Sequence, residues 1–255
     1  MNTRRFVKTY PSSAAARTAR AHYRWLASLQ PDVVFPDLLG GTGDTVEFAH
    51  IPGRTAGIGD LVTVSAALGR LHQAARRAGL DRAQVNSRFT TSGGLRLTPF
   101  AGPRRQRLHQ LRARTADCPL GHQDIDAWLD RAALLPAALY KDANPRNFLI
   151  TPGADVVLVD FDSLTLAPVG YDLAKLLVTT GMTHGRLPRN AADDTIAAYT
   201  RELALELPFS ELAVWAEMHD LLTRSYLGRH GYGHPWPAVR PWPVPDLAIP
   251  TAGSR

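Results

Sequence analysis

The chain has 255 residues, of which 45% are hydrophobic and 20% are charged, a composition typical of a globular protein with one large domain or two lobes. No run of about 18 apolar residues is present to span a membrane, and the first ten residues hold no apolar stretch typical of a signal peptide. The single cysteine excludes a disulfide framework, so the composition favours the reducing cytoplasm.

The formal net charge of +6 is unevenly distributed along the chain. Residues 1–164 carry 21 basic and 14 acidic side chains, whereas residues 165–255 carry 8 and 9. This pattern suits an anionic ligand held on one side as well as it suits a nucleic acid. Of the 29 basic residues only three are lysines, Lys8, Lys141 and Lys175, and 26 are arginines. We therefore look for a role for each lysine, with compositional drift as the alternative.

The first eighty residues predict strands followed by a helix. Alternating side chains, turn residues and apolar residues at helical spacing define these elements. The expected elements are a strand at 5–10, a helix capped by Ser12 or Ser13, antiparallel strands at 33–39 and 45–51, and a helix from Asp60 to Gly79.

The rest of the chain is predicted to be mainly helical. Residues 81–121 read as irregular, and their arginine-rich run at 104–114 is either a solvated surface or a contact for phosphate or nucleic acid. Further helices are expected at 124–135, 191–207 and 210–227. Two short apolar strands, 148–150 and 156–159, predict a hairpin.

Polar residues gather at the two outer ends of this hairpin. Asp142 and Asn147 precede its first strand, and Asp160 and Asp162 follow its second strand. Antiparallel pairing brings these ends together. Carboxylate and amide oxygens are the ligands that Mg²⁺ prefers, so the hairpin predicts a magnesium site. The alternative for Asp142 and Asn147 is a capped turn.

The pattern Asp142-x4-Asn147 followed by Asp160-Phe161-Asp162 resembles the catalytic loop and metal motif of the aminoglycoside phosphotransferase and choline kinase superfamily, which has a protein-kinase-like fold. Other segments are similar to that superfamily in the same order. Residues 6–8 are similar to its lysine strand, and residues 47–53 are similar to its hinge. Residues 68–72 are similar to its first large-lobe helix, and residues 170–174 are similar to the segment whose Asp braces the catalytic loop.

The resemblance implies an ATP- and Mg²⁺-dependent phosphotransferase that acts on a hydroxyl of a small molecule. It makes Asp142 the catalytic base. It makes Asn147, Asp160 and Asp162 the metal ligands. Lys8 would bind the phosphates, with a surface lysine as the alternative, and the backbone at Glu47, Ala49 and Ile51 would bind adenine.

The implied fold is α+β and two-lobed, with a shortened N-terminal β lobe at 1–52 and a mainly helical lobe at 53–255. In the superfamily, two strands and a Gly-rich loop precede the lysine strand, and we expect the residues before Lys8 to be too few to hold them. No acidic residue occurs from Asn2 through Gln30 to pair with Lys8. These departures keep open a catalytically impaired pseudokinase that binds a nucleotide or a partner, because phosphoryl transfer depends mostly on positioning.

The acceptor is expected to contact the C-terminal helices. Their acidic residues are either solvated or attract a cationic aminoglycoside or amino alcohol; they are Glu202, Glu206, Glu211, Glu217 and Asp220. Lys141 and Arg146 are candidates to stabilise the transferred phosphoryl group, with surface cations as the alternative, and Lys175 reads as an ordinary helix residue. We expect no membrane partner, and nucleic-acid binding ranks last among the three functions considered.

Overall fold

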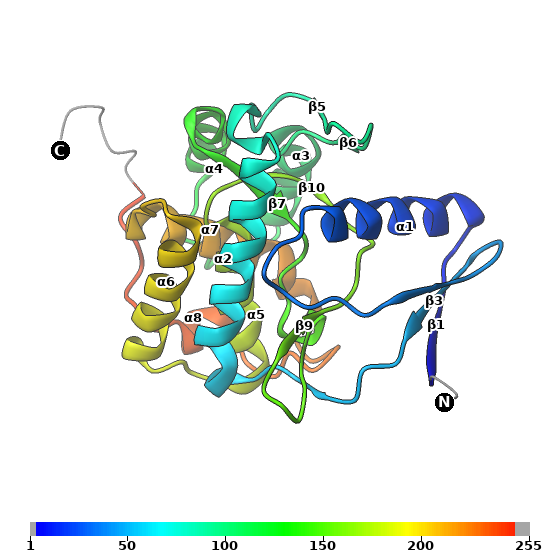
Figure 1. Ribbon diagram of the computed structural model, residues 1–255. Helices are drawn as coiled ribbons and strands as arrows, with labels where there is room; N and C mark the ends of the chain where they lie inside the picture. Colours follow the sequence, from blue (N-terminus) through cyan, green and yellow to red (C-terminus); the bar gives the residue numbers. More distant parts are fainter. Residues whose placement is uncertain (1–3, 248–255) are drawn as a thin grey trace.

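The N-terminal part is a small antiparallel sheet crossed by one helix. The computed structural model describes residues 4–247. Strand β1 (Arg5–Thr9) leads into α1 (Ser13–Ser28), followed by β2 (Leu38–Gly40) and β3 (Thr45–Ala49). The strand order is β1-β3-β2, so β1 lies at one edge. This part extends away from the helical body (Figure 1).

The elements predicted for this part are confirmed. Ser12 caps α1 by accepting a hydrogen bond from the Ala15 N–H at 3.2 Å. The predicted antiparallel pair is β2 and β3, although β2 begins only at Leu38, because Pro36 interrupts the preceding apolar run. In β1 the side chains of Phe6 and Lys8 share one face, since alternate residues of a strand point the same way.

A second sheet joins this part to the remainder of the chain. The predicted hairpin is confirmed as β8 (Phe148–Ile150) and β9 (Val156–Leu158), and β4 (Arg54–Thr55) adds a third strand beside β8. Val34 forms a parallel bridge to Val157, so a segment between α1 and β2 also contacts this sheet. The sheet therefore joins the hairpin to the segment between α1 and β2.

Four long helices form the body of the molecule. Helix α2 (Leu61–Arg77) packs against α6 (Arg189–Leu203), and α5 (Tyr171–His184) packs against α7 (Phe209–Thr223) (Figure 1). The α2–α6 approach is close at Gly69, where a Cβ would lie 2.6 Å from the Tyr199 carbonyl oxygen. A short helix, α8 (Trp236–Val239), packs on α5.

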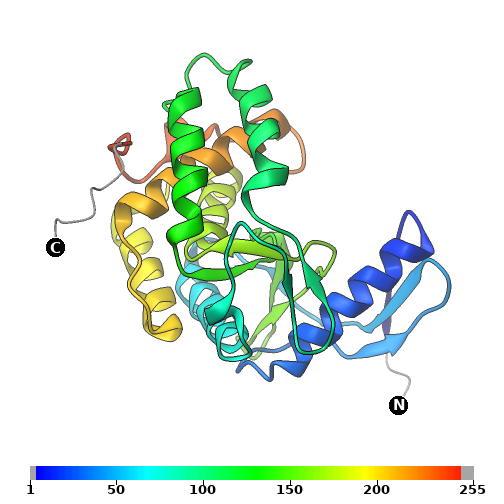
Figure 2. The same cartoon turned by 90° about the horizontal axis from the view of Figure 1, so that it is seen from above.

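The segment between α2 and the catalytic loop is more regular than predicted. It holds the short pair β5 (Phe89–Thr90) and β6 (Arg96–Leu97), then α3 (Ala101–Arg112) and α4 (His122–Arg131), which pack against each other (Figure 2). The weak apolar periodicity of α3 hid it from sequence analysis: only Ala101 and Leu108 are buried.

Two flanking strands complete the fold around the catalytic loop. Strand β7 (Ala137–Tyr140) pairs antiparallel with β10 (Thr165–Pro168), so that Thr165 lies opposite Tyr140. The pair encloses the segment 141–164 between its two strands. Among residues 4–247, no helix is both long enough and apolar enough to cross a membrane.

Candidate functional site

The hairpin brings the predicted polar residues together. Val159 donates its N–H to the Asn147 carbonyl at 3.0 Å, which places Asn147 beside the residue that precedes Asp160. The Asn147 Nδ2 donates to the Asp142 carbonyl at 2.8 Å. Asp142 and Asp160 both adopt positive φ values, 65° and 66°, which cost non-glycine residues roughly 1–2 kcal/mol each. The surrounding contacts hold both residues in this backbone conformation.

Lys8 lies directly on the carboxylates that follow the hairpin. Its Nζ is 3.0 Å from Asp160 Oδ1 and 2.7 Å from Asp162 Oδ2. Burial acts to raise the pKa of Asp160, but the hydrogen bond and the charge of Lys8 outweigh it and keep the pKa below its usual value. Lys8 thus has acidic partners here, although α1 supplies none.

Helix α1 contributes a histidine that contacts the segment after the hairpin. His22 Nδ1 lies 2.9 Å from the Phe161 carbonyl oxygen. The Phe161 ring packs against the rings of Tyr23, Phe35 and Phe48, at centroid distances of 5.0–5.9 Å. Aromatic packing and one polar contact therefore tie α1 to the segment that carries Asp160 and Asp162.

Lys141 is buried and holds two loops together. Its Nζ donates to the carbonyls of Val159 and Asp160 at 2.6 and 2.8 Å, and the residue is only 2% exposed. Burial lowers the pKa of Lys141 to about 8, although Asp160 and other carboxylates act in the opposite direction. Lys141 is not a surface cation, and its ammonium group is engaged by backbone oxygens.

Asp172 braces the catalytic loop, as the resemblance implies. Its carboxylate accepts the N–H groups of Lys141 and Ala143 at 2.9 and 2.7 Å. Burial raises the pKa of Asp172 to about 6, against the effect of these two donors. His72 Nε2 lies 4.0 Å from Asp172, but burial lowers the pKa of His72 to about 3, so this contact is not an ion pair at neutral pH.

Lys175 contacts Asp142, which sequence analysis missed. Lys175 Nζ is 3.2 Å from Asp142 Oδ1, and the Tyr140 hydroxyl donates to the same oxygen at 3.0 Å. Burial opposes the charged form of Lys175, yet the Asp142 carboxylate raises its pKa overall. The scarcity of lysine was the available signal, and all three lysines lie within this site.

A pocket of about 420 Å³ lies on the N-terminal side of the hairpin. Lys8, Ala49, Ile51, Asn147 and Asp160 are among the residues that line it, together with the rings of Phe6, Tyr10, Phe48 and Phe161. An apolar pocket with a lysine and hard oxygen atoms at one end suits a nucleotide.

The predicted hinge residues differ in their contacts. Glu47 is not part of the pocket lining, and its carboxylate pairs with Arg5 at 3.0 Å. The N–H groups of Ala49 and His50 donate to the carbonyls of Asp37 and Arg4 at 2.8 Å. The Ile51 N–H has no hydrogen-bond partner within residues 4–247, so it is available to a ligand.

A second pocket of about 540 Å³ lies on the other side of Asp142. Its charged lining comprises Asp142 and the three cations Arg104, Arg146 and Lys175. Tyr140, Tyr226 and Tyr232 add aromatic surface. The two pockets therefore adjoin at Arg146, which lines both of them, whereas Asp142 lines only the second.

The acidic residues of the C-terminal helices do not face this second pocket. Glu211, Glu217 and Asp220 are buried, and each pairs with an arginine, namely Arg131, Arg240 and Arg224. Both interpretations offered for these three residues, a solvated surface and an attraction for a cationic acceptor, are therefore wrong. The reason is that α7 is buried on nearly all sides, where a carboxylate needs a partner.

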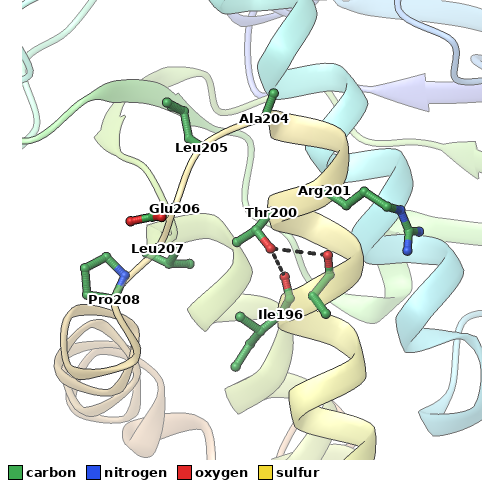
Figure 3. Close-up of a pocket in the computed structure, with 9 residues that line it drawn as sticks. Ile196, Thr200, Arg201, Ala204, Leu205, Glu206, Leu207 and Pro208 are labelled. Carbon is green, nitrogen blue, oxygen red and sulfur yellow. Dashed lines mark hydrogen bonds between the residues drawn. The ribbon is translucent and has the colours of Figure 1, made fainter.

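The remaining two acidic residues also lie elsewhere. Glu202 is 3.8 Å from Arg70. Glu206 lines a separate open hollow between the end of α6 and the start of α7, where the Thr200 hydroxyl donates to the Ile196 carbonyl (Figure 3). This hollow has no residue in common with the catalytic loop.

The donor set beside Asp160 fits a magnesium ion. Within residues 4–247, no group of three or more His, Cys, Asp or Glu forms a metal cluster. Mg²⁺ needs only one or two protein carboxylates, because water and phosphate oxygens complete its shell. Asp160 and Asp162 supply carboxylate oxygens, and the Asn147 amide, whose nitrogen is already engaged, keeps its oxygen for a cation.

The chain matches a known family over most of its length. The family model described as the phosphotransferase enzyme family (APH) matches residues 2–218. No curated protein matches the sequence.

Several solved structures share the fold. A macrolide 2′-phosphotransferase from Brachybacterium faecium superposes with a TM-score of 0.59 and 18% identity, covering 87% of this chain and 77% of the other. A choline kinase from Streptococcus pneumoniae gives 0.57 and 13%, covering 88% and 78%. An aminoglycoside phosphotransferase from Streptomyces rimosus, solved with ADP and streptomycin, gives 0.54 and 20%, covering 86% of each chain. The expected α+β, protein-kinase-like fold is confirmed.

Proposed function

Because the chain belongs to the phosphotransferase enzyme family, we propose that it transfers the γ-phosphoryl group of ATP to a hydroxyl of a small molecule, with Mg²⁺ as the required metal. The observation that carries the proposal is that Asp142 lines a pocket open to an acceptor, and that this pocket shares Arg146 with a second pocket whose lining suits a nucleotide. The single cysteine, which is free and buried, is consistent with the cytoplasm as the proposed location.

On the nucleotide side, we assign adenine to the backbone near Glu47, Ala49 and Ile51, with the free Ile51 N–H as the donor. Lys8 contacts the phosphates, next to the carboxylates that it already touches. Asn147, Asp160 and Asp162 hold the metal. The bound Mg²⁺ neutralises negative charge on the phosphates.

On the acceptor side, Asp142 is the general base. Its Oδ1 is engaged by Tyr140 and Lys175, which leaves Oδ2 to accept the proton of the acceptor hydroxyl. The acceptor oxygen forms the new bond to the γ-phosphorus while the bond from that phosphorus to the bridging oxygen breaks, and ADP leaves with the electron pair. Lys175 and Tyr140 orient the carboxylate for this step.

The competing function is a catalytically impaired pseudokinase. One observation favours it: Lys8 contacts both proposed metal carboxylates, and α1 has no acidic residue to draw this lysine away. A pseudokinase would bind a nucleotide or a partner without transferring a phosphoryl group.

Two measurements on the same protein separate the two functions. Calorimetry with ATP, with and without Mg²⁺, tests nucleotide binding, and ADP release is then followed with pooled alcohols, amino alcohols, aminoglycosides and hydroxy acids. Mg²⁺-dependent binding with acceptor-stimulated ADP release supports the phosphotransferase. Binding without stimulation supports a nucleotide-binding pseudokinase. The absence of any nucleotide binding overturns the phosphotransferase and leaves a pseudokinase that binds a partner.

A further inference from the structure

The acceptor pocket is unusual in the sign of its charge. Three cationic side chains, Arg104, Arg146 and Lys175, line it, and among the described residues Asp142 is the only carboxylate in the lining. Lys175 is neutralised by Asp142, since their charged atoms are 3.2 Å apart. The two guanidinium groups remain as uncompensated positive charge in the pocket.

Neither guanidinium has an acidic partner. Within residues 4–247, no carboxylate forms an ion pair with Arg104 or Arg146, whereas the arginines beside α7 are each paired with one. Arg146 Nη2 is buried and lacks any hydrogen-bond partner in that part of the chain, although the guanidinium lies 4.8 Å from the centre of the Tyr232 ring. The Arg146 guanidinium therefore has a donor that is free for an anion in either of the two pockets that Arg146 lines.

Arg104 is held rigidly at the wall of the pocket. Its Nη1 donates to the Phe100 carbonyl at 2.9 Å and its Nη2 to Thr165 Oγ1 at 3.2 Å. The guanidinium also lies over the Tyr140 ring at 4.9 Å. Since the Tyr140 hydroxyl contacts Asp142, the chain Arg104–Tyr140–Asp142 links the positive wall to the proposed base. A cation fixed in this way is preorganised for an anion, because little side-chain entropy remains to be lost.

From this arrangement we propose that the acceptor is an anionic hydroxy compound, whose carboxylate or phosphate group binds at Arg104 and Arg146 while its hydroxyl lies at Asp142. The inference rests on the proposed function and specifies its substrate class. It separates this chain from two of the similar structures, because choline and streptomycin are cations. A cationic acceptor would meet two guanidinium groups without an acidic partner, and the carboxylate of Asp142 is already paired with Lys175.

Two series of acceptors test the proposal; within each series the carbon skeleton is the same and the charge differs. The three-carbon series is glycerate, glycerol 3-phosphate, glycerol and 3-amino-1,2-propanediol, and the six-carbon series is gluconate, glucitol and glucamine. Affinity is measured by calorimetry on the MgADP-loaded protein, and kcat/KM by ADP release with MgATP. Comparing glycerate with glycerol 3-phosphate shows whether the pocket prefers a carboxylate or a phosphate group.

We expect the anion of at least one series to bind and react at least ten times better than the cation of the same skeleton. The advantage should shrink as NaCl is raised from low to high concentration. Arg104→Gln should remove the preference, Arg104→Lys should retain part of it, and Arg107→Gln, an exposed arginine on the same helix, should leave it unchanged. Melting temperatures confirm that each variant is folded.

Other results overturn the inference. The inference is contradicted if, in both series, the cation binds as well as or better than the anion of the same skeleton, even if Arg104→Gln fails to fold. It is also contradicted if no member of either series binds to the MgADP-loaded protein. If MgADP itself does not bind, the proposed function fails as well. The failure of the substrate class and the failure of the phosphotransferase proposal are therefore distinguishable.

Discussion

The two pockets that adjoin at Arg146 are built in different ways. The nucleotide pocket is lined by contiguous segments, the strand at Lys8, the hinge at 48–51 and the hairpin ends at Asn147 and Asp160. The acceptor pocket combines residues of the 140–146 loop with residues that α3, α5, α7 and the segment after α7 bring to it. The proposed residues for metal binding and base catalysis therefore lie in short sequence motifs. The proposed choice of acceptor depends on residues that are far apart in sequence and that only the fold brings together.

The largest expected effect is the loss of turnover when Asp142 is changed. Asp142→Asn should lower kcat by about 10³-fold, because it removes the proposed base. MgATP affinity should not change, since Asp142 does not line the nucleotide pocket. Steady-state ADP release and calorimetry measure the two quantities, with Asp193→Asn, an exposed residue of α6, as the matched control. Retained turnover would remove Asp142 from the reaction.

A change on the nucleotide side should act on binding. Asp160→Asn should weaken Mg²⁺-dependent ATP binding by at least about 10- to 100-fold, the size of effect that perturbing a metal site typically produces. Binding of an acceptor anion to the nucleotide-free protein should be unaffected. Calorimetry at several Mg²⁺ concentrations checks both, and Asp155→Asn, in the turn of the same hairpin, is the control. Equal affinities in wild type and Asp160→Asn would count against the metal site.

A change on the acceptor side should act on rate. Lys175→Met should reduce kcat about tenfold, because one charged contact to Asp142 of roughly 1.5 kcal/mol is lost. The KM for MgATP should stay the same, and Lys175→Arg should restore part of kcat. The exposed Arg186→Met variant controls for loss of a positive charge. A higher KM for MgATP with unchanged kcat would contradict the assigned role, because it would show that Lys175 acts on nucleotide binding.

The smallest effect concerns the contact of Lys8 with Asp160 and Asp162. Because the pKa of Asp160 is lowered, the contact stabilises the fold above about pH 4 and its contribution is lost as the pH falls below that value. The pKa of Lys8 is raised, so the contribution is also lost at pH values above about 10.5. The side chains are partly exposed, which limits it to about 1 kcal/mol.

Chemical unfolding of wild type and Lys8→Met between pH 3 and pH 9 measures this contribution. The difference in unfolding free energy should be constant from about pH 5 to 9 and decrease below pH 4. A difference that grows as the pH falls would contradict the assigned ion pair. Lys8→Arg, which keeps the charge, should follow the wild type.

The contiguous side of the site was predictable from sequence. Asp142, Asn147 and Asp160 flank a hairpin whose pairing follows from short apolar strands, and the structure brings the hairpin ends together. The brace at Asp172 also follows the resemblance. Local patterns suffice for Asp142, Asn147 and Asp160 because their contacts lie within a single hairpin, whereas Asp172 is found only through the resemblance.

The scattered side of the site was not predictable. Lys175 reads as an ordinary helix residue because nothing in its neighbourhood indicates that α5 directs it to Asp142. The carboxylates of α7 read as surface charge, because their arginine partners Arg131 and Arg240 are distant in sequence. Arg104 lies in a run of arginines, and only the fold distinguishes it from Arg105, which pairs with Asp126 and Asp130 of α4.

The most direct test of phosphoryl transfer follows labelled phosphate. The protein is incubated with Mg²⁺, with ATP labelled at the γ-phosphorus and with the acceptors of the two skeleton-matched series. The products are then separated. We predict that the label moves to an organic acceptor in the wild type and not in Asp142→Asn, although both bind MgATP equally. Label that appears only as inorganic phosphate, or that stays on bound ATP with every acceptor, would contradict the proposed function.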